Sequence, residues 1–454
     1  MLTNEIKISG LDRFKHIYIA GKTQLGKSTL VSHLALKDIE IGRGVCVMDA
    51  KSKLIDDILQ YLPEHRKDDV ILLDRKHPIP LDFMSYQGLP DGTWDEDEKE
   101  KIIGEIKFLY TKSESLDRAP TIRSNLDNII HALLDYNENI PADDEEKSKR
   151  RATFLDIYYF LMDEGRRDAI RRGLKTEKYI AYWNDPKSLP TGDNKFRLIS
   201  RLTEFVNNHN LTAIFDAPMP KFNVAKAIQE RKIILVKLGD ITQSQAIYAT
   251  LLLAKIRQAM DRNGEVTDRD IIPFFLYCDE FQKFQTSDFP DMLSRAGGLG
   301  LALTLVNQYP KQLASEIQDA IVGTISSRIA FQMEPEVAGF LRGTFPKPDR
   351  NSYPPIPDYF AMLPNLQVGE CVYKIANGSY GKATTPNPHE RKTPQRNHAA
   401  FVKDVQDATE EKYHCDIVKR SYHEVNIPSD VIPPTPPKPV PPNPHKAARA
   451  RTSR

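Results

Sequence analysis

The sequence has almost no excess of charge of either sign. Among its 454 residues, Lys and Arg number 63 and Asp and Glu number 62, so the formal net charge is +1. A strongly basic chain would indicate contact with nucleic acid over much of its surface, and this balance excludes that arrangement. A nucleic-acid partner must therefore be held by a local patch or an inner channel.

Long hydrophobic runs and paired cysteines are also lacking. The longest apolar stretch, AIYATLLLA at 246–254, is far shorter than the roughly 20 residues that span a bilayer. The N-terminal residues carry no apolar run typical of a signal peptide. Cys46, Cys278, Cys371 and Cys415 show no disulfide or metal-ligand spacing. We therefore expect reduced thiols in a cytoplasmic protein without a membrane span.

Residues 1–94 alternate short apolar runs with amphipathic segments. The pattern predicts strands at 16–20, 45–49 and 70–74. Helices are expected between them, at 27–36 and 53–62. Such alternation is typical of an α/β fold in which a mostly parallel sheet carries helices on both faces.

The following residues, 95–212, change to helical periodicity throughout. The segments concerned are 98–110, 121–136, 152–174 and 195–209, separated by charged or Pro/Gly-rich loops. We interpret this region as an all-α domain inserted into the α/β fold. Strand signals resume in 213–390, where five runs are predicted to complete the sheet: 232–240, 271–280, 301–308, 326–333 and 369–375.

The C-terminal region has no pattern that could build a core. A short helical extension is expected at 391–430, and residues 431–454 contain eight prolines and end in a basic tip. This composition is typical of a disordered, polyproline-like spacer. Its basic tip could tether the chain to DNA or to an acidic partner, and a tail without function explains it equally well.

A phosphate-binding loop is the clearest motif. GKTQLGKST fits G-x-x-x-x-G-K-[ST] without departure and lies between a predicted strand and a predicted helix. The glycines let successive N–H groups point to one place, the lysine neutralises the β- and γ-phosphates, and the first hydroxyl coordinates Mg²⁺. The predicted nucleotide-binding residues are Gly21, Lys22, Thr23, Gln24, Leu25, Gly26, Lys27, Ser28 and Thr29.

An acidic pair supplies the second motif. The apolar run IIPFFLYCDE ends in Asp279 and Glu280. Asp279 is predicted to hold Mg²⁺ together with Ser28, and Glu280 to orient and deprotonate the attacking water. The motifs together predict ATP and Mg²⁺ as cofactors.

Weaker signals concern the γ-phosphate. The run LALTLVNQ ends in Asn307 and Gln308, where a polar side chain can sense the γ-phosphate, and Gln308 is our candidate. Arginines that could reach a neighbouring subunit's γ-phosphate are Arg295, Arg328 and Arg342, of which Arg295 and Arg328 are favoured. A polar strand end and ordinary surface or sheet-edge arginines are the alternatives.

In order along the chain, these motifs resemble the HerA/FtsK superfamily of P-loop ATPases. Within it, they resemble the type IV secretion coupling proteins (TraG/TraD/TrwB-like), over about 15–390. The most specific features are the Asp49-Ala50-Lys51 turn, the Asp279-Glu280 pair and the Gln308 strand end. The resemblance implies a RecA-like core with an inserted all-α domain in a hexameric ring, with Lys27 and Ser28 sharing in hydrolysis.

The implied function is ATP-driven DNA translocation, on single- or double-stranded DNA. A relaxase, a nuclease or a membrane secretion partner is possible by the same resemblance. The chain departs from the family because it shows no transmembrane helix and no N-terminal β-barrel. Two alternatives stay open: an ATPase that moves protein substrates in secretion or packaging, and a nucleotide-gated switch that recruits a nuclease or relaxase. An ABC signature and a GTPase N-K-x-D motif are absent, and the insert is larger than a small-molecule kinase needs.

The basic segments 229–233 and 164–175 could contact DNA phosphates. Both are explained equally well as solvated helix faces.

Overall fold

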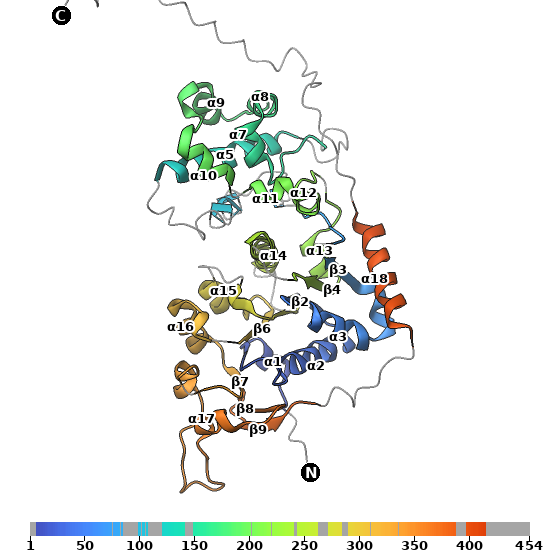
Figure 1. Ribbon diagram of the computed structural model, residues 1–454, viewed down its shortest axis with the longest axis vertical. Helices are drawn as coiled ribbons and strands as arrows, with labels where there is room; N and C mark the ends of the chain where they lie inside the picture. The colour runs from blue at the N-terminus through green and yellow to red at the C-terminus, as the bar shows by residue number, and fades with distance from the viewer. Residues whose placement is uncertain are drawn as a thin grey trace, which may run out of the picture.

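The structure is a computed structural model of the chain (Figure 1). It describes residues 6–74, 76–81, 83–84, 99–100, 102–104, 106–107, 120–140, 149–200, 202–218, 220–239, 243–261, 271–283, 289–308, 310–334, 336–386 and 396–414. The Pro-rich segment 431–454, with its basic tip, and residues 391–395 and 415–430 of the predicted extension lie outside these residues.

One nine-stranded sheet organises the molecule, in the order β3-β4-β2-β5-β6-β1-β7-β8-β9. Its strands are β1 (Ile17–Ala20), β2 (Gly44–Asp49), β3 (Val70–Asp74), β4 (Ile233–Lys237), β5 (Phe274–Cys278), β6 (Leu301–Asn307), β7 (Ser327–Phe331), β8 (Glu370–Lys374) and β9 (Tyr380–Thr384). The strands from β3 to β7 in this order are parallel, and β8 and β9 are added antiparallel. The predicted mostly parallel α/β fold is confirmed.

The nine strands include all eight predicted from the sequence. β9 was not predicted, because its sequence YGKAT is short and has only one buried side chain, at Ala383. It pairs along the whole of β8, which is half-buried.

Two layers of helices cover the two faces of the sheet. One layer consists of α2 (Lys27–Glu40), α3 (Lys53–Tyr61) and α18 (His398–Tyr413), and the other includes α14 (Gln243–Asp261), α15 (Phe289–Ala296) and α16 (Ser315–Thr324) (Figure 1). Alternate strand residues enter two separate cores, so that Ile17 and Ile19 face the α2 layer while Tyr18 faces the α14 layer. This alternation explains why the central strands are apolar on both sides.

α2 is longer than the predicted 27–36. Its buried residues continue through Ala35 and Ile39, so the apolar face packs on the sheet for another turn. The remaining short helices of the core are α1 (Gly10–Arg13), α13 (Val224–Gln229) and α17 (Tyr359–Met362).

Between β3 and α13, the regular elements beyond residue 99 in the described part of the chain are helices. They are α5 (Pro120–Glu138), α7 (Asp156–Met162), α8 (Glu164–Arg172), α9 (Glu177–Asn184), α10 (Gly192–Ser200), α11 (Thr203–Asn207) and α12 (His209–Phe215). They gather at one end of the molecule, above α14 in Figure 1. No described helix is long and apolar enough to cross a membrane.

Candidate nucleotide site

Four neighbouring strands end at the same edge of the sheet. The order β2-β5-β6-β1 and the pairings Ala20↔Asn307 and Met48↔Cys278 bring their carboxyl ends into register. The phosphate loop follows β1, Asp49 ends β2, the acidic pair follows β5, and Asn307 ends β6. Ligands of open α/β sheets bind at this edge. The topology therefore gathers the predicted motifs.

The phosphate loop begins at Gly21, which only glycine could occupy. Its φ is +153°, and a Cβ there would lie 2.5 Å from the Cβ of Phe331. Gly26, with φ +107°, caps α2 without a side-chain hydrogen bond. The first N–H groups of a helix have no intrahelical acceptor, so the loop presents donors for an anion.

Lys27 is buried at the start of this helix. Its ammonium group donates to the carbonyl oxygens of Gly21 at 2.6 Å and Lys22 at 2.5 Å. Burial lowers the pKa of Lys27 to about 8, although Asp279 and Glu280 act in the opposite direction. A bound phosphate would favour its charged form, so the cradle fits a polyphosphate. Ser28 follows in the first turn and is exposed.

The antiparallel end of the sheet supports the loop from behind. The N–H of Gly369 donates to the carbonyl of Leu25 at 3.0 Å, and the Oγ1 of Thr385 lies 3.1 Å from where a Cβ on Gly26 would be. The Lys22 side chain forms an ion pair of 2.6 Å with Glu334, which follows β7. These bracing residues were not predicted, because they are more than 300 residues away in sequence.

Asp279 is buried where β5 ends. Burial, followed by the charges of Asp49 and Glu280, raises the pKa of Asp279 to about 7. A divalent cation would relieve this concentration of negative charge. No cluster of three or more His, Cys, Asp or Glu that could hold a metal is found in the described part of the chain. Mg²⁺ is commonly bound by one or two protein ligands together with phosphate oxygens, and Asp279 and Ser28 fit that mode.

Glu280 has an unusual backbone, with φ +54°. Its carboxylate accepts from the ammonium of Lys51 at 2.7 Å and from the amide of Gln282 at 2.5 Å. Burial by itself would raise the pKa of Glu280, but these hydrogen bonds outweigh it and the pKa is lowered. Positive φ in a glutamate is strained and is often found at functional sites.

The polar end of β6 is linked to this carboxylate through Asn307, the residue before the predicted γ-phosphate sensor Gln308. The buried Asn307 donates from Nδ2 to the Oε1 of Gln282 at 3.0 Å. Gln308 is partly exposed, and no contact between it and the acidic pair is found among the described residues. Gln282 and Lys51 are the polar residues of the site that we did not predict as site residues.

The Asp49-Ala50-Lys51 turn is shaped by a buried carboxylate. Asp49 accepts from the backbone N–H groups of Lys51 at 2.7 Å and Leu54 at 2.8 Å, which caps the start of α3. Burial raises the pKa of Asp49 against these hydrogen bonds. The capped turn directs the Lys51 side chain to Glu280.

The two favoured arginines have different surroundings. Arg328 lies on β7, is 6% exposed, and donates to the carbonyls of Ile321 and Val322 at the end of α16. Arg295 lies near the end of α15 with a side chain 54% exposed, at 3.5 Å from Asp261 and 3.6 Å from Asp291. An arginine that serves a neighbouring subunit must be exposed, so Arg295 fits that role better.

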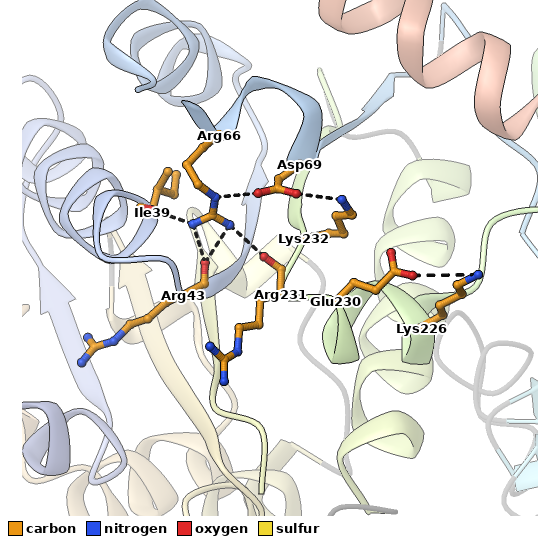
Figure 2. Close-up of polar contacts among 8 residues, drawn as sticks. All are labelled: Ile39, Arg43, Arg66, Asp69, Lys226, Glu230, Arg231 and Lys232. Carbon is orange, nitrogen blue, oxygen red and sulfur yellow. Dashed lines mark hydrogen bonds and ion pairs between the residues drawn. The ribbon is translucent and has the colours of Figure 1, made fainter. Parts of the chain in front are cut away.

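Segment 229–233 lies where β4 begins, at the edge of the sheet opposite the phosphate loop. Figure 2 shows the Arg66 guanidinium among the carbonyls of Ile39, Arg43 and Arg231 and the Asp69 carboxylate. Lys232 pairs with the same Asp69 at 2.7 Å. The exposed Arg231 side chain points away from this cluster, and Glu230 lies apart from it, 3.9 Å from Lys226 (Figure 2). The segment therefore holds strand ends together.

Segment 164–175 contains α8, whose arginines are also engaged. Arg166 is buried in ion pairs with Asp156 and Asp216. Arg171 contacts Asp168 and Asn184. These contacts agree with the simpler interpretation of a partly solvated helix.

Known structures share this architecture. TrwB, a plasmid coupling protein, solved in complex with ADP and Mg²⁺, aligns with a TM-score of 0.56 and 13% identity over 87% of this chain and 91% of that chain. The chain has the fold of the coupling protein TrwB. An unbound form, TrwBΔN70, described as a bacterial conjugative coupling protein, gives 0.55 and 13% over 86% of this chain and 89% of that one.

TrwB with the non-hydrolysable GTP analogue GDPNP gives 0.54 and 13% identity over 87% of this chain and 92% of that one. No family model matches the sequence, and no curated protein matches it. The resemblance to coupling proteins is thus confirmed at the level of the fold.

Proposed function

We propose that this protein is an ATP-hydrolysing, ring-forming DNA translocase. The observation that carries the proposal is the meeting of the phosphate loop, Asp279 and Glu280 at one edge of a sheet with the fold of TrwB. In this proposal Lys27 binds the β- and γ-phosphates, Ser28 and Asp279 hold Mg²⁺, and Glu280 activates water. Gln308 remains the proposed γ-phosphate sensor.

In the proposed ring, a residue of the neighbouring subunit completes each nucleotide site. ATP is proposed to bind between subunits of a homo-hexamer, with Arg295 of one subunit reaching the γ-phosphate of the next and DNA in the central channel. The helices of 95–212 form, in this proposal, a separate domain that contacts substrate or a partner such as a relaxase or nuclease. The buried free thiols Cys46, Cys278 and Cys371 support a cytoplasmic location.

The proposal is tested by ATP turnover with and without single- and double-stranded DNA, beside a Lys27→Ala variant. Turnover stimulated by either DNA and abolished in the variant is the expected result. Turnover that is indifferent to DNA at low and moderate salt would contradict the DNA motor. It would favour a protein-moving ATPase, or a switch if the rate is slow and a partner binds only with nucleotide.

A further inference from the structure

Both oxygens of the Glu280 carboxylate are occupied by donors from the protein itself. Oε1 accepts from Lys51 at 2.7 Å, and Oε2 accepts from Gln282 at 2.5 Å. The Glu280 side chain is only 7% exposed, so the carboxylate is largely shielded from water, while the Lys51 side chain that it binds is 50% exposed. Each donor takes one of the two lone-pair sites of its oxygen and fixes the direction of the carboxylate, whereas a general base must point a lone pair at the water that it deprotonates.

The direction of the Lys51 contact follows from the order of the strands. Lys51 follows β2, Glu280 follows β5, and the phosphate loop follows β1, while the strands lie in the order β2-β5-β6-β1. Lys51 therefore holds the carboxylate from the side of β5 that faces away from the phosphates. On the other side, Lys27 is folded onto the carbonyls of Gly21 and Lys22.

The Lys51 side chain can leave this position. It is 50% exposed, whereas Glu280 is buried, and its backbone is fixed separately by the hydrogen bond from its N–H to Asp49. The ammonium group can thus swing into solvent without disturbing the turn. Gln282 is held by Asn307 at 3.0 Å and stays in place to orient the released carboxylate.

We propose that Lys51 is a positioning residue that holds Glu280 in a resting position until cargo stimulates turnover. The inference rests on the proposed function, because it assumes that Glu280 activates water. Breaking the Lys51–Glu280 ion pair frees Oε1 to turn towards the phosphate loop. Lys51 thereby keeps hydrolysis slow in the absence of cargo.

The test compares basal ATP turnover, without DNA, in the wild type and in Lys51→Met. We expect the variant's basal rate constant kcat to rise about tenfold, the factor for losing one charge-assisted hydrogen bond. KM for ATP should stay within about twofold, because Lys51 does not line the phosphate loop. The stimulation by DNA should shrink by the same factor as the basal rate rises. Lys51→Arg keeps the ion pair and should behave as the wild type.

Lys237→Met is the matched control. Lys237 ends the neighbouring strand β4 and pairs with Asp56 at 2.7 Å, so this variant loses an equivalent ion pair that does not involve Glu280. Its basal rate should not change. Thermal unfolding of both Met variants verifies that they are folded, and Lys51→Gln, which also removes the charge that pairs with Glu280, serves if Lys51→Met is not folded.

A basal kcat in Lys51→Met that equals or falls below that of the wild type would overturn the inference. An equal rise in Lys237→Met would also overturn it, since the effect would then be general. Failure of the proposed function is distinguishable, because the wild type itself would then show no turnover that depends on Lys27, with or without DNA.

Discussion

Gly21 shows how one residue determines the shape of the phosphate loop. Its positive φ and the 2.5 Å approach to Phe331 leave no room for a side chain. Gly21→Ala is expected to lower the free energy of unfolding by about 1–3 kcal/mol and to abolish stabilisation by ATP. Thermal unfolding with and without ATP–Mg²⁺ measures both effects.

Gly323→Ala is the matched control, because a Cβ at this position in α16 meets nothing within 4 Å. It should leave the stability unchanged or slightly raised. A Gly21→Ala protein that is still stabilised by ATP would contradict the geometry proposed for the loop.

His16 gives the molecule a sensitivity to acid. Its Nε2 lies 3.0 Å from the carbonyl of Leu293, and its Nδ1 accepts from the N–H of Leu303 at 3.2 Å, which requires the neutral ring. Burial lowers the pKa of His16 to about 4. Between that value and the ordinary pKa, the unfolded chain binds a proton that the folded chain does not, so stability falls as the pH falls.

The expected loss attributable to His16 is about 2 kcal/mol between pH 7 and pH 5. Denaturant unfolding at several pH values measures it against His16→Asn, since Asn tolerates the left-handed backbone at this position. The variant should show a shallower dependence on pH over this interval. Equal slopes for the two proteins would contradict a neutral, buried His16.

The positions of candidate site residues could be predicted only where a motif fixes them. Lys27, Ser28 and Asp279 lie where the spacing predicts, because a phosphate loop and an acid after a strand are local patterns. The Lys51–Glu280 contact joins residues 229 positions apart and depends on strand order. Arg328 looked like a candidate for contact with a neighbour, but the inward face of β7 buries its side chain.

At the scale of elements, α18 protects an edge of the sheet. It packs Phe401 and Val405 into the core, and Thr409 accepts a hydrogen bond of 3.3 Å from the N–H of Leu72 on the edge strand β3. An unpaired edge invites association with other chains. The helix therefore closes a strand that the sheet leaves open.

Thr409→Val keeps the volume of the side chain and removes this acceptor. We expect the free energy of unfolding to fall by about 1 kcal/mol, because the buried N–H loses its partner. Hydrogen exchange at the Leu72 amide should become faster, while exchange in the central strand β6 follows only the global change. Unchanged protection at Leu72 would contradict the role given to Thr409.

The sequence predicted which segments form strands and helices better than it predicted which of these elements pack together. Apolar runs of five to ten residues between amphipathic helices indicated eight strands and a mostly parallel sheet. β9 was not predicted, because most of its side chains are exposed and its extended backbone depends on pairing with β8. The place of α18 against β3 could not be predicted, because it depends on which strand lies at the edge.

At the scale of the whole molecule, the proposed ring predicts that sites are shared between subunits. A Lys27→Ala subunit still has Arg295 for the neighbouring site. An Arg295→Ala subunit still has an intact phosphate loop of its own. Each variant alone should have little DNA-stimulated turnover. An equal mixture of the two variants should recover DNA-stimulated turnover at about a quarter of the interfaces, because random assembly joins an intact phosphate loop to an intact Arg295 at that fraction.

Lys27→Ala mixed with Glu280→Gln is the control, because both residues come from the same subunit and no mixture restores them to one site. A mixture of Lys27→Ala and Arg295→Ala that is no more active than the two variants alone would contradict Arg295 as the shared residue.

The central claim is that the carboxyl edge of β1, β2, β5 and β6 is a hydrolytic nucleotide site. Its most direct test is the rate of ATP hydrolysis by the purified chain with Mg²⁺, beside Lys27→Ala and Glu280→Gln. We predict measurable turnover that falls by roughly 10²–10⁴-fold in Glu280→Gln, with ATP binding retained, and that is lost together with binding in Lys27→Ala. Turnover of the same rate in all three proteins would contradict the account.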